Sequence, residues 1–73
     1  MTIHQADLDN WFVYHSPKPG QNEKYVEIRD AAKVFAEVIV QLTPPSADQT
    51  AAIRKIREAV FTANAAIACS QTE

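Results

Sequence analysis

A two-proline break divides this chain into two long amphipathic segments. Proline disfavours helix in the residue before it and removes a backbone donor, so a helix is expected to end before Pro44-Pro45. On both sides of the break, apolar residues recur three and four positions apart, which places them on one face of a helix. The first apolar seam comprises Tyr25, Ile28, Ala32, Phe35, Ile39 and Leu42, and the second comprises Ile53, Ile56, Val60, Ala63 and Ile67.

The predicted fold class is all-α. One helix is expected over residues 22–42 and another over residues 46–69, each about 30 Å long at about 1.5 Å per residue. Because the connection is short, the two helices are expected to pair as an antiparallel hairpin. An N-terminal segment over residues 1–21 precedes them, with a short helical turn expected within residues 2–10. Residues 1–73 are expected to form a single domain, since a chain of this length has room for no more.

Two polar signals mark the helix starts. Asn22 is the expected N-cap of the first helix, after Gly20 ends the preceding loop. Ser46, with Gln49 three residues later, has the pattern of a capping box for the second helix. Both signals agree with the boundaries that the apolar seams predict.

The hairpin is too small to be stable on its own. A chain of 73 residues buries only about 60 % of its unfolded surface, and small domains usually need disulfides, metals or oligomerisation. Cys69 is the single cysteine and no zinc-site spacing occurs, so no metal is expected and oligomerisation remains. Further apolar residues lie off the seams, namely Val26, Val34, Val38, Val40 and Phe61. We therefore expect a homo-oligomeric helical bundle.

Charge and motifs exclude several protein classes. A net charge of −2 argues against a DNA-coating protein, which needs a basic surface. The amino terminus lacks the regions of a signal peptide and no apolar run approaches about 18 residues, so we expect a cytoplasmic protein without membrane contact. No catalytic triad, Walker loop or dinucleotide fingerprint is readable, so neither enzymatic activity nor a cofactor is expected.

Aromatic and cationic residues gather around the start of the first predicted helix. Flat rings offer a stacking surface for a base, while nearby cations and the free amides of a helix start favour a phosphate. The alternative is that the rings fold onto the hairpin as a hydrophobic lid and the cations face solvent. The rings are Trp11, Phe12 and Tyr14 in the aromatic loop (residues 11–20), and the cations are Lys18, Lys24 and Arg29.

Several motifs resemble a widespread phage hairpin domain. Its first half is similar to Tyr14-His15-x-Pro17-Lys18, followed by Gln21, Tyr25 and Ile28-Arg29-x-Ala31-Ala32. Its second helix resembles Glu58-Ala59-Val60 and Ala63-Asn64-Ala65-Ala66-Ile67-Ala68. The resemblance covers about residues 11–68. Anti-CBASS protein 2 and the first Thoeris anti-defence protein share this domain, and the short length of this chain favours the anti-CBASS branch.

The resemblance implies a sponge for signalling molecules that is not an enzyme. Such hairpins assemble, commonly into hexamers, and sequester cyclic oligonucleotide messengers of bacterial immunity in the infected host. Cyclic dinucleotides such as cyclic GMP-AMP bind between protomers. Some members also take cyclic trinucleotides at a separate site, and Thoeris-branch members take cyclic ADP-ribose isomers. A small helical protein-interaction module without a nucleotide ligand is the alternative.

The resemblance also implies a ligand-binding site and one departure from the family pattern. Tyr14 would stack on a base, Arg29 would meet a phosphate and Lys24 would be a second cation at the rim. The remaining site residues are Trp11, which offers a second ring, and His15, Pro17 and Lys18, which shape the loop. Relatives often have a basic residue directly after the Ala-Ala-Ile-Ala run, where this chain has Cys69. That departure puts trinucleotide binding in doubt, with Arg57 or Asn64 as the residues that would have to compensate, although no geometric reason favours either.

Overall fold

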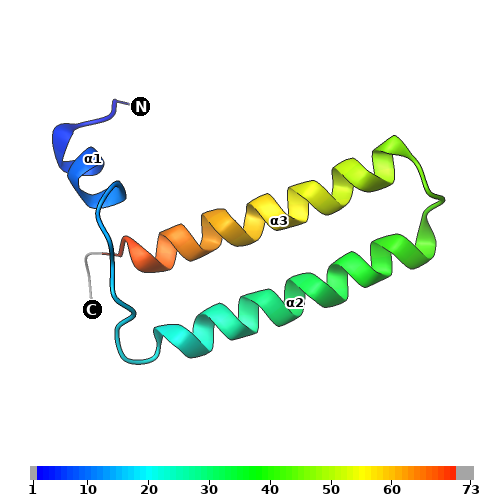
Figure 1. Ribbon diagram of the computed structural model, residues 1–73, viewed down its shortest axis with the longest axis horizontal. Helices are drawn as coiled ribbons and strands as arrows, with labels where there is room; N and C mark the ends of the chain where they lie inside the picture. Colours follow the sequence, from blue (N-terminus) through cyan, green and yellow to red (C-terminus); the bar gives the residue numbers. More distant parts are fainter. Residues whose placement is uncertain (1, 71–73) are drawn as a thin grey trace.

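The chain folds as a helical hairpin with one short helix at its open end. The computed structural model describes residues 2–70 and leaves residues 1 and 71–73 outside the description. The described residues form α1 (Gln5–Trp11), α2 (Gln21–Leu42) and α3 (Ala47–Ala68), with no strand. Helices α2 and α3 lie side by side and antiparallel, and α1 lies near the end of α3 (Figure 1). The predicted all-α hairpin with a short N-terminal helix is confirmed.

Helix α2 begins before Asn22, so the predicted cap at Asn22 is wrong. Gly20 is the N-cap, with a φ of 85° in the left-handed region that glycine adopts without strain. The backbone amide of Gln21 donates to the Lys18 carbonyl at 3.0 Å, and Gln21 Oε1 accepts from the Lys18 amide at 2.8 Å. This reciprocal pair places the cap two residues before the predicted one and leaves Asn22 inside the first turn of the helix.

The connection between α2 and α3 fulfils half of the predicted capping box. Ser46 Oγ accepts a hydrogen bond from the Gln49 amide at 3.1 Å, as predicted. The Gln49 side chain does not return to Ser46, because its Nε2 donates to the carbonyl and the hydroxyl of Thr43, both at 3.1 Å. Gln49 therefore ties the start of α3 to the end of α2, which holds the hairpin turn closed.

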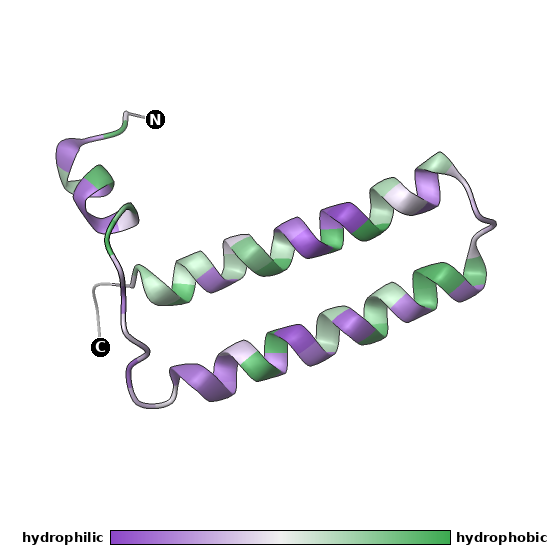
Figure 2. Cartoon of the chain, viewed as in Figure 1, coloured by the Kyte–Doolittle hydropathy of each residue, from purple (hydrophilic) through white to green (hydrophobic). Residues whose placement is uncertain are grey.

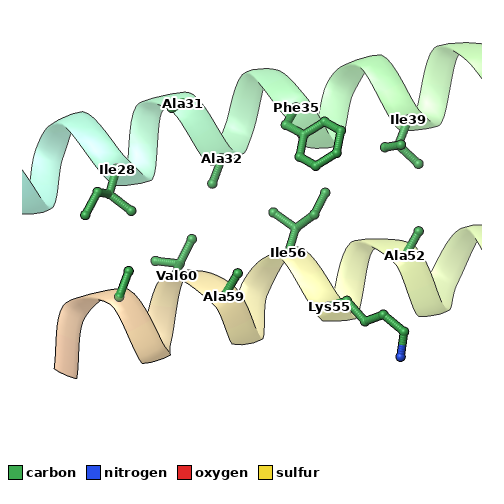
Figure 3. Close-up of a pocket in the computed structure, with 11 residues that line it drawn as sticks. Ile28, Ala31, Ala32, Phe35, Ile39, Ala52, Lys55, Ile56, Ala59 and Val60 are labelled. Carbon is green, nitrogen blue, oxygen red and sulfur yellow. The ribbon is translucent and has the colours of Figure 1, made fainter. Parts of the chain in front are cut away.

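The two predicted apolar seams face each other between α2 and α3 (Figure 3). All the α3 seam residues are half-buried, and so are Tyr25, Ile28, Ala32 and Ile39 on α2. Phe35 and Leu42 remain 55% and 79% exposed, because the hairpin has no third element beside them. The seam therefore joins the two helices without enclosing its larger side chains.

The described part of the chain has no buried apolar side chain, so the hairpin lacks a core of its own. Its radius of gyration is 15.5 Å, whereas a compact domain of this length has about 11 Å. The off-seam valines and Phe61 are between 41% and 60% exposed. Apolar surface on this scale is typical of a chain that associates with something else.

Apolar and polar residues alternate around both long helices (Figure 2). Green and purple segments follow one another along α2 and α3, on the outer sides of the hairpin as well as the inner. Among residues 2–70, no helix is both long enough and apolar enough to cross a membrane.

Candidate functional site

Two amide side chains tie the N-terminal segment to the end of α3. Asn10 Nδ2 donates to the Cys69 carbonyl at 2.9 Å, and Gln21 Nε2 donates to the Ile67 carbonyl at 3.1 Å. The last carbonyls of a helix lack intrahelical partners, so donors are stabilising at this position. Asn10 and Gln21 thus hold the two ends of the aromatic loop against one end of the hairpin.

The aromatic loop is also braced from within. His15 Nε2 lies 2.7 Å from the Asn10 carbonyl oxygen. Because a carbonyl only accepts hydrogen bonds, this nitrogen carries the proton and donates it. The His15 ring therefore folds back toward α1 and fixes the shape of the loop between them.

The aromatic rings of the loop face solvent in the single chain. Phe12 and Tyr14 are 82% and 81% exposed, and Trp11 is 48% exposed. A hydrophobic lid would bury these rings against the hairpin, so the lid alternative does not describe this conformation. Rings left in solvent are available for a ligand or for a second copy of the chain.

One side of the α2–α3 seam is an apolar groove of about 570 Å³ (Figure 3). Its lining includes Ile28, Phe35, Ile39, Ile56, Val60 and Lys55. Ile28, Phe35 and Ile39 point from α2 toward Val60 and Ile56 on α3, as the close-up shows (Figure 3). With Lys55 as its one charged lining residue, this groove suits an apolar partner better than an anion.

The other side of the seam carries a more polar hollow of about 630 Å³, which we name the Arg29 hollow. Its volume lies within the range of small-molecule pockets, about 300–1,000 Å³. Helix α2 contributes Asn22, Tyr25 and Arg29, and α3 contributes Phe61 and Asn64. This set combines a guanidinium for a phosphate, amides for hydrogen bonds and aromatic rings for stacking.

Further cations lie next to the Arg29 hollow. Arg29 also borders the neighbouring hollow along the hairpin, together with Lys33 and Arg57. The Arg57 guanidinium carbon lies 5.9 Å from the Phe61 ring centroid, within cation–π range. Three cations therefore lie around one exposed ring on this flank of the Arg29 hollow. On the opposite flank, the hollow that shares Asn22 and Val26 with it is acidic, lined by Glu23, Glu27 and Asp30. Across residues 2–70, no group of three or more His, Cys, Asp or Glu side chains is placed to hold a metal ion.

The predicted site residues do not share one hollow within a single chain. Arg29 lines the Arg29 hollow, whereas Lys24 borders a hollow on the side of the apolar groove, with Ile28 and Ile67. Five residues along a helix turn through about 140°, which points the two cations in different directions. The remaining predicted residues belong to the end of α1 and to the loop that leads to α2, and they line neither the groove nor the Arg29 hollow. They are Trp11, Tyr14, His15, Pro17 and Lys18.

Of the residues named for the Arg29 hollow, sequence reasoning assigned only Arg29 to the ligand site and missed four others, Asn22, Tyr25, Phe61 and Asn64. Asn22 was assigned to a helix cap, Tyr25 to the apolar seam and Phe61 to the apolar residues beside it. Asn64 was considered only as a compensation for the missing cation at Cys69. The sequence does contain a signal for the α3 residues of this hollow. A spacing of four, three and four joins Arg57, Phe61, Asn64 and Ala68. That spacing predicts a second stripe on the same helix, beside the apolar seam.

The chain matches a known protein family along most of its length. Residues 4–68 match the family described as Acb2/Tad1, hairpin domain. The chain belongs to the Acb2/Tad1 hairpin family. The resemblance read from the sequence is confirmed, and the match also reaches residue 4, so the Acb2/Tad1 hairpin domain includes α1. No curated protein and no solved structure matches the chain.

Gln21→Ala is expected to loosen the aromatic loop of this Acb2/Tad1 hairpin domain. The substitution removes the hydrogen bonds that the Gln21 side chain makes with the Lys18 amide and the Ile67 carbonyl. Their loss should lower the free energy of unfolding by about 1–3 kcal/mol. Urea unfolding at a fixed protein concentration measures the loss, and chymotrypsin should cleave after Tyr14 faster than in the wild type. Gln41→Ala removes an exposed glutamine of the same helix and should change neither the free energy of unfolding nor the rate of cleavage. Unchanged cleavage of Gln21→Ala would show that other contacts hold the loop.

Proposed function

We propose that this protein is a phage anti-defence sponge for the cyclic oligonucleotide messengers of CBASS immunity. The match of residues 4–68 to the Acb2/Tad1 hairpin domain carries the proposal. In this role the protein binds cyclic dinucleotides such as cyclic GMP-AMP in the cytoplasm of an infected bacterium. It holds them without cleaving them, so the host effector stays inactive.

The chemistry of the described residues supports a ligand that combines bases and phosphates. The Tyr14 ring is 81% exposed and free to stack on a base, a contact typically worth about 1–3 kcal/mol. Arg29 places a guanidinium at a hollow of nucleotide size. A cyclic dinucleotide carries its bases and its phosphates on different parts of the molecule, so a stacking ring and a guanidinium can bind it at the same time.

The ligand site is proposed to form between copies of the chain. Tyr14 and Arg29 do not line a common hollow in one protomer, so a site that uses both needs a second protomer. Residues 2–70 also contain no buried apolar side chain, which leaves the apolar groove to be covered by another copy. A homo-oligomer meets both requirements, and by resemblance to the family the proposed form is a hexamer.

Cys69 bears on whether a cyclic trinucleotide binds as well. The Cys69 carbonyl accepts from Asn10, and its Sγ lies 3.9 Å from the Asn10 carbonyl oxygen. This end of α3 therefore holds the N-terminal segment, and residue 69 supplies no cation. We propose that cyclic dinucleotides bind more tightly than trinucleotides, with cyclic ADP-ribose isomers of Thoeris signalling as the alternative ligand class.

A second candidate function is a protein-interaction module without a nucleotide. The observation that favours it is the exposure of large apolar side chains away from the seam, with Val34 and Phe61 both 60% exposed. In that case the aromatic loop would contact a partner protein and no nucleotide would bind.

Isothermal titration calorimetry with cyclic GMP-AMP tests the proposal. The wild-type protein should bind the nucleotide, and heat denaturation should release it intact for detection by chromatography. Separate titrations with cyclic tri-AMP and cyclic ADP-ribose isomers rank the ligand classes. Recovery of a hydrolysed product would identify an enzyme instead, and failure to bind any of these molecules would favour the interaction module.

Tyr14→Ala separates the two candidate functions. If Tyr14 stacks on a base, the substitution should weaken cyclic GMP-AMP binding by roughly tenfold or more. Oligomer mass and helicity should stay nearly unchanged, because the ring is exposed in the single chain. Tyr14→Phe keeps the ring and should retain most of the affinity. A loss of mass or stability in Tyr14→Ala, without any ligand to lose, would support the structural role.

A further inference from the structure

Asn64 carries a buried acceptor that has no partner in the described part of the chain. Its Oδ1 is shielded from solvent and accepts no hydrogen bond within residues 2–70. The residue is half-buried on α3 and lines the Arg29 hollow. Rotation of its amide about the Cβ–Cγ bond, a soft torsion in asparagine, turns Oδ1 from the protein side toward the hollow, where a ligand can reach it. A buried polar atom without a partner destabilises a fold, and most such atoms in proteins are paired. Leucine has nearly the same shape and would carry no such penalty at this position.

The surroundings of Asn64 indicate what kind of partner would satisfy this amide. Arg29 faces the hollow from α2 and Phe61 lies one helical turn before Asn64 on α3. A phosphate held by the guanidinium would place the rest of a nucleotide in the same hollow. A side-chain amide presents one acceptor and two donors, which matches a base edge that has a donor beside an acceptor.

We propose that Asn64 reads a base edge of the bound cyclic dinucleotide and so determines ligand specificity, an inference that rests on the proposed function. Arg29 and Asn64 then have different roles in ligand binding at the same hollow. The Arg29 contact goes to a phosphate, which every cyclic dinucleotide carries, so it contributes affinity without discrimination. The Asn64 contact goes to a base, so its contribution differs from one ligand to another.

Asn64→Leu tests the proposal through two readouts that should move in opposite directions. The melting temperature at a fixed protein concentration should rise by about 4–8 °C, as expected when the cost of the unpaired acceptor is removed. The Kd for cyclic GMP-AMP should rise by roughly tenfold, because the base loses its hydrogen-bonding partner. Asn64→Ala also removes the amide with a smaller side chain and should weaken binding similarly, which covers the case that leucine does not fit. Thr62→Val is the control. Thr62 is exposed on the same helix and lines neither the apolar groove nor the Arg29 hollow, so the variant should bind cyclic GMP-AMP as the wild type does.

Ligand preference distinguishes a base contact from a general loss. In both Asn64 variants, the ratio of the affinities for cyclic di-AMP and cyclic di-GMP should change, whereas Arg29→Ala should weaken both by a similar factor. Wild-type affinity and an unchanged ratio in both variants would overturn the inference and leave the sponge function standing. A loss of binding accompanied by a lower oligomer mass would overturn it too, because the amide would then be paired between protomers. If the wild type binds no cyclic dinucleotide, the proposed function fails and this inference fails with it.

Discussion

Phe35→Asp is expected to dissociate the protein and unfold it at micromolar concentration. Phe35 is 55% exposed in the single chain, so in an isolated hairpin the substitution would remove part of the seam packing but leave the carboxylate hydrated. If a second copy covers the apolar groove, the same carboxylate is buried without a partner, which is strongly destabilising. The size of the effect therefore reports whether another chain covers this groove.

Light scattering and far-UV circular dichroism measure this outcome. The wild type should have a mass several times 8.1 kDa, and its melting temperature should rise with protein concentration. The Phe35→Asp variant should scatter light as a single chain and should lack the circular dichroism signal of helices. Gln41→Asp adds the same charge at an exposed position of α2 and should retain both. A well-folded wild-type monomer of 8.1 kDa at micromolar concentration would contradict the assembly.

Arg29→Ala is expected to weaken cyclic GMP-AMP binding on the order of a hundredfold. Charge-assisted hydrogen bonds from a guanidinium to a phosphate are among the stronger polar contacts, typically about 1.5–3 kcal/mol. Arg29 lines the Arg29 hollow and also borders the adjoining one, so no other described cation has the same position. Titration calorimetry gives the loss, and added salt should weaken the variant less than the wild type because one ionic contact is missing.

Arg54→Ala is the matched control for this experiment. Arg54 is an exposed arginine on α3, and its removal changes the net charge by the same amount. It lines neither the apolar groove nor the Arg29 hollow, so the Kd should stay within about twofold of the wild type, as expected for an exposed surface charge. Equal losses in the two variants would assign the effect to overall charge and remove Arg29 from the site.

The helices could be predicted because their signals are local. Residues three and four apart meet on one helix face whatever the rest of the chain does, so the two seams indicated both long helices. Pro44 and Pro45 marked the break between them for the same reason. The start of α2 was less predictable, because Gln21 is held by a turn with Lys18 and by the distant Ile67 carbonyl.

The candidate site could be predicted only in part. Arg29 and Lys24 are close in sequence, but their side chains border different hollows, because a helix turns between them. Asn64 joins Arg29 at one hollow although the hairpin turn separates them along the chain. Which residues meet across the seam depends on how one helix is rotated against the other, and no local spacing specifies that rotation.

The sequence by itself determined two amphipathic helices, the break between them and membership of the Acb2/Tad1 hairpin family. Only the tertiary structure decided that the aromatic rings face solvent, that Asn10 and Gln21 dock the N-terminal segment on α3, and that the described residues enclose no apolar core. The physical reason is the range of the interactions. Helix formation depends on neighbours within about four residues, whereas docking and burial depend on contacts between segments far apart in the chain.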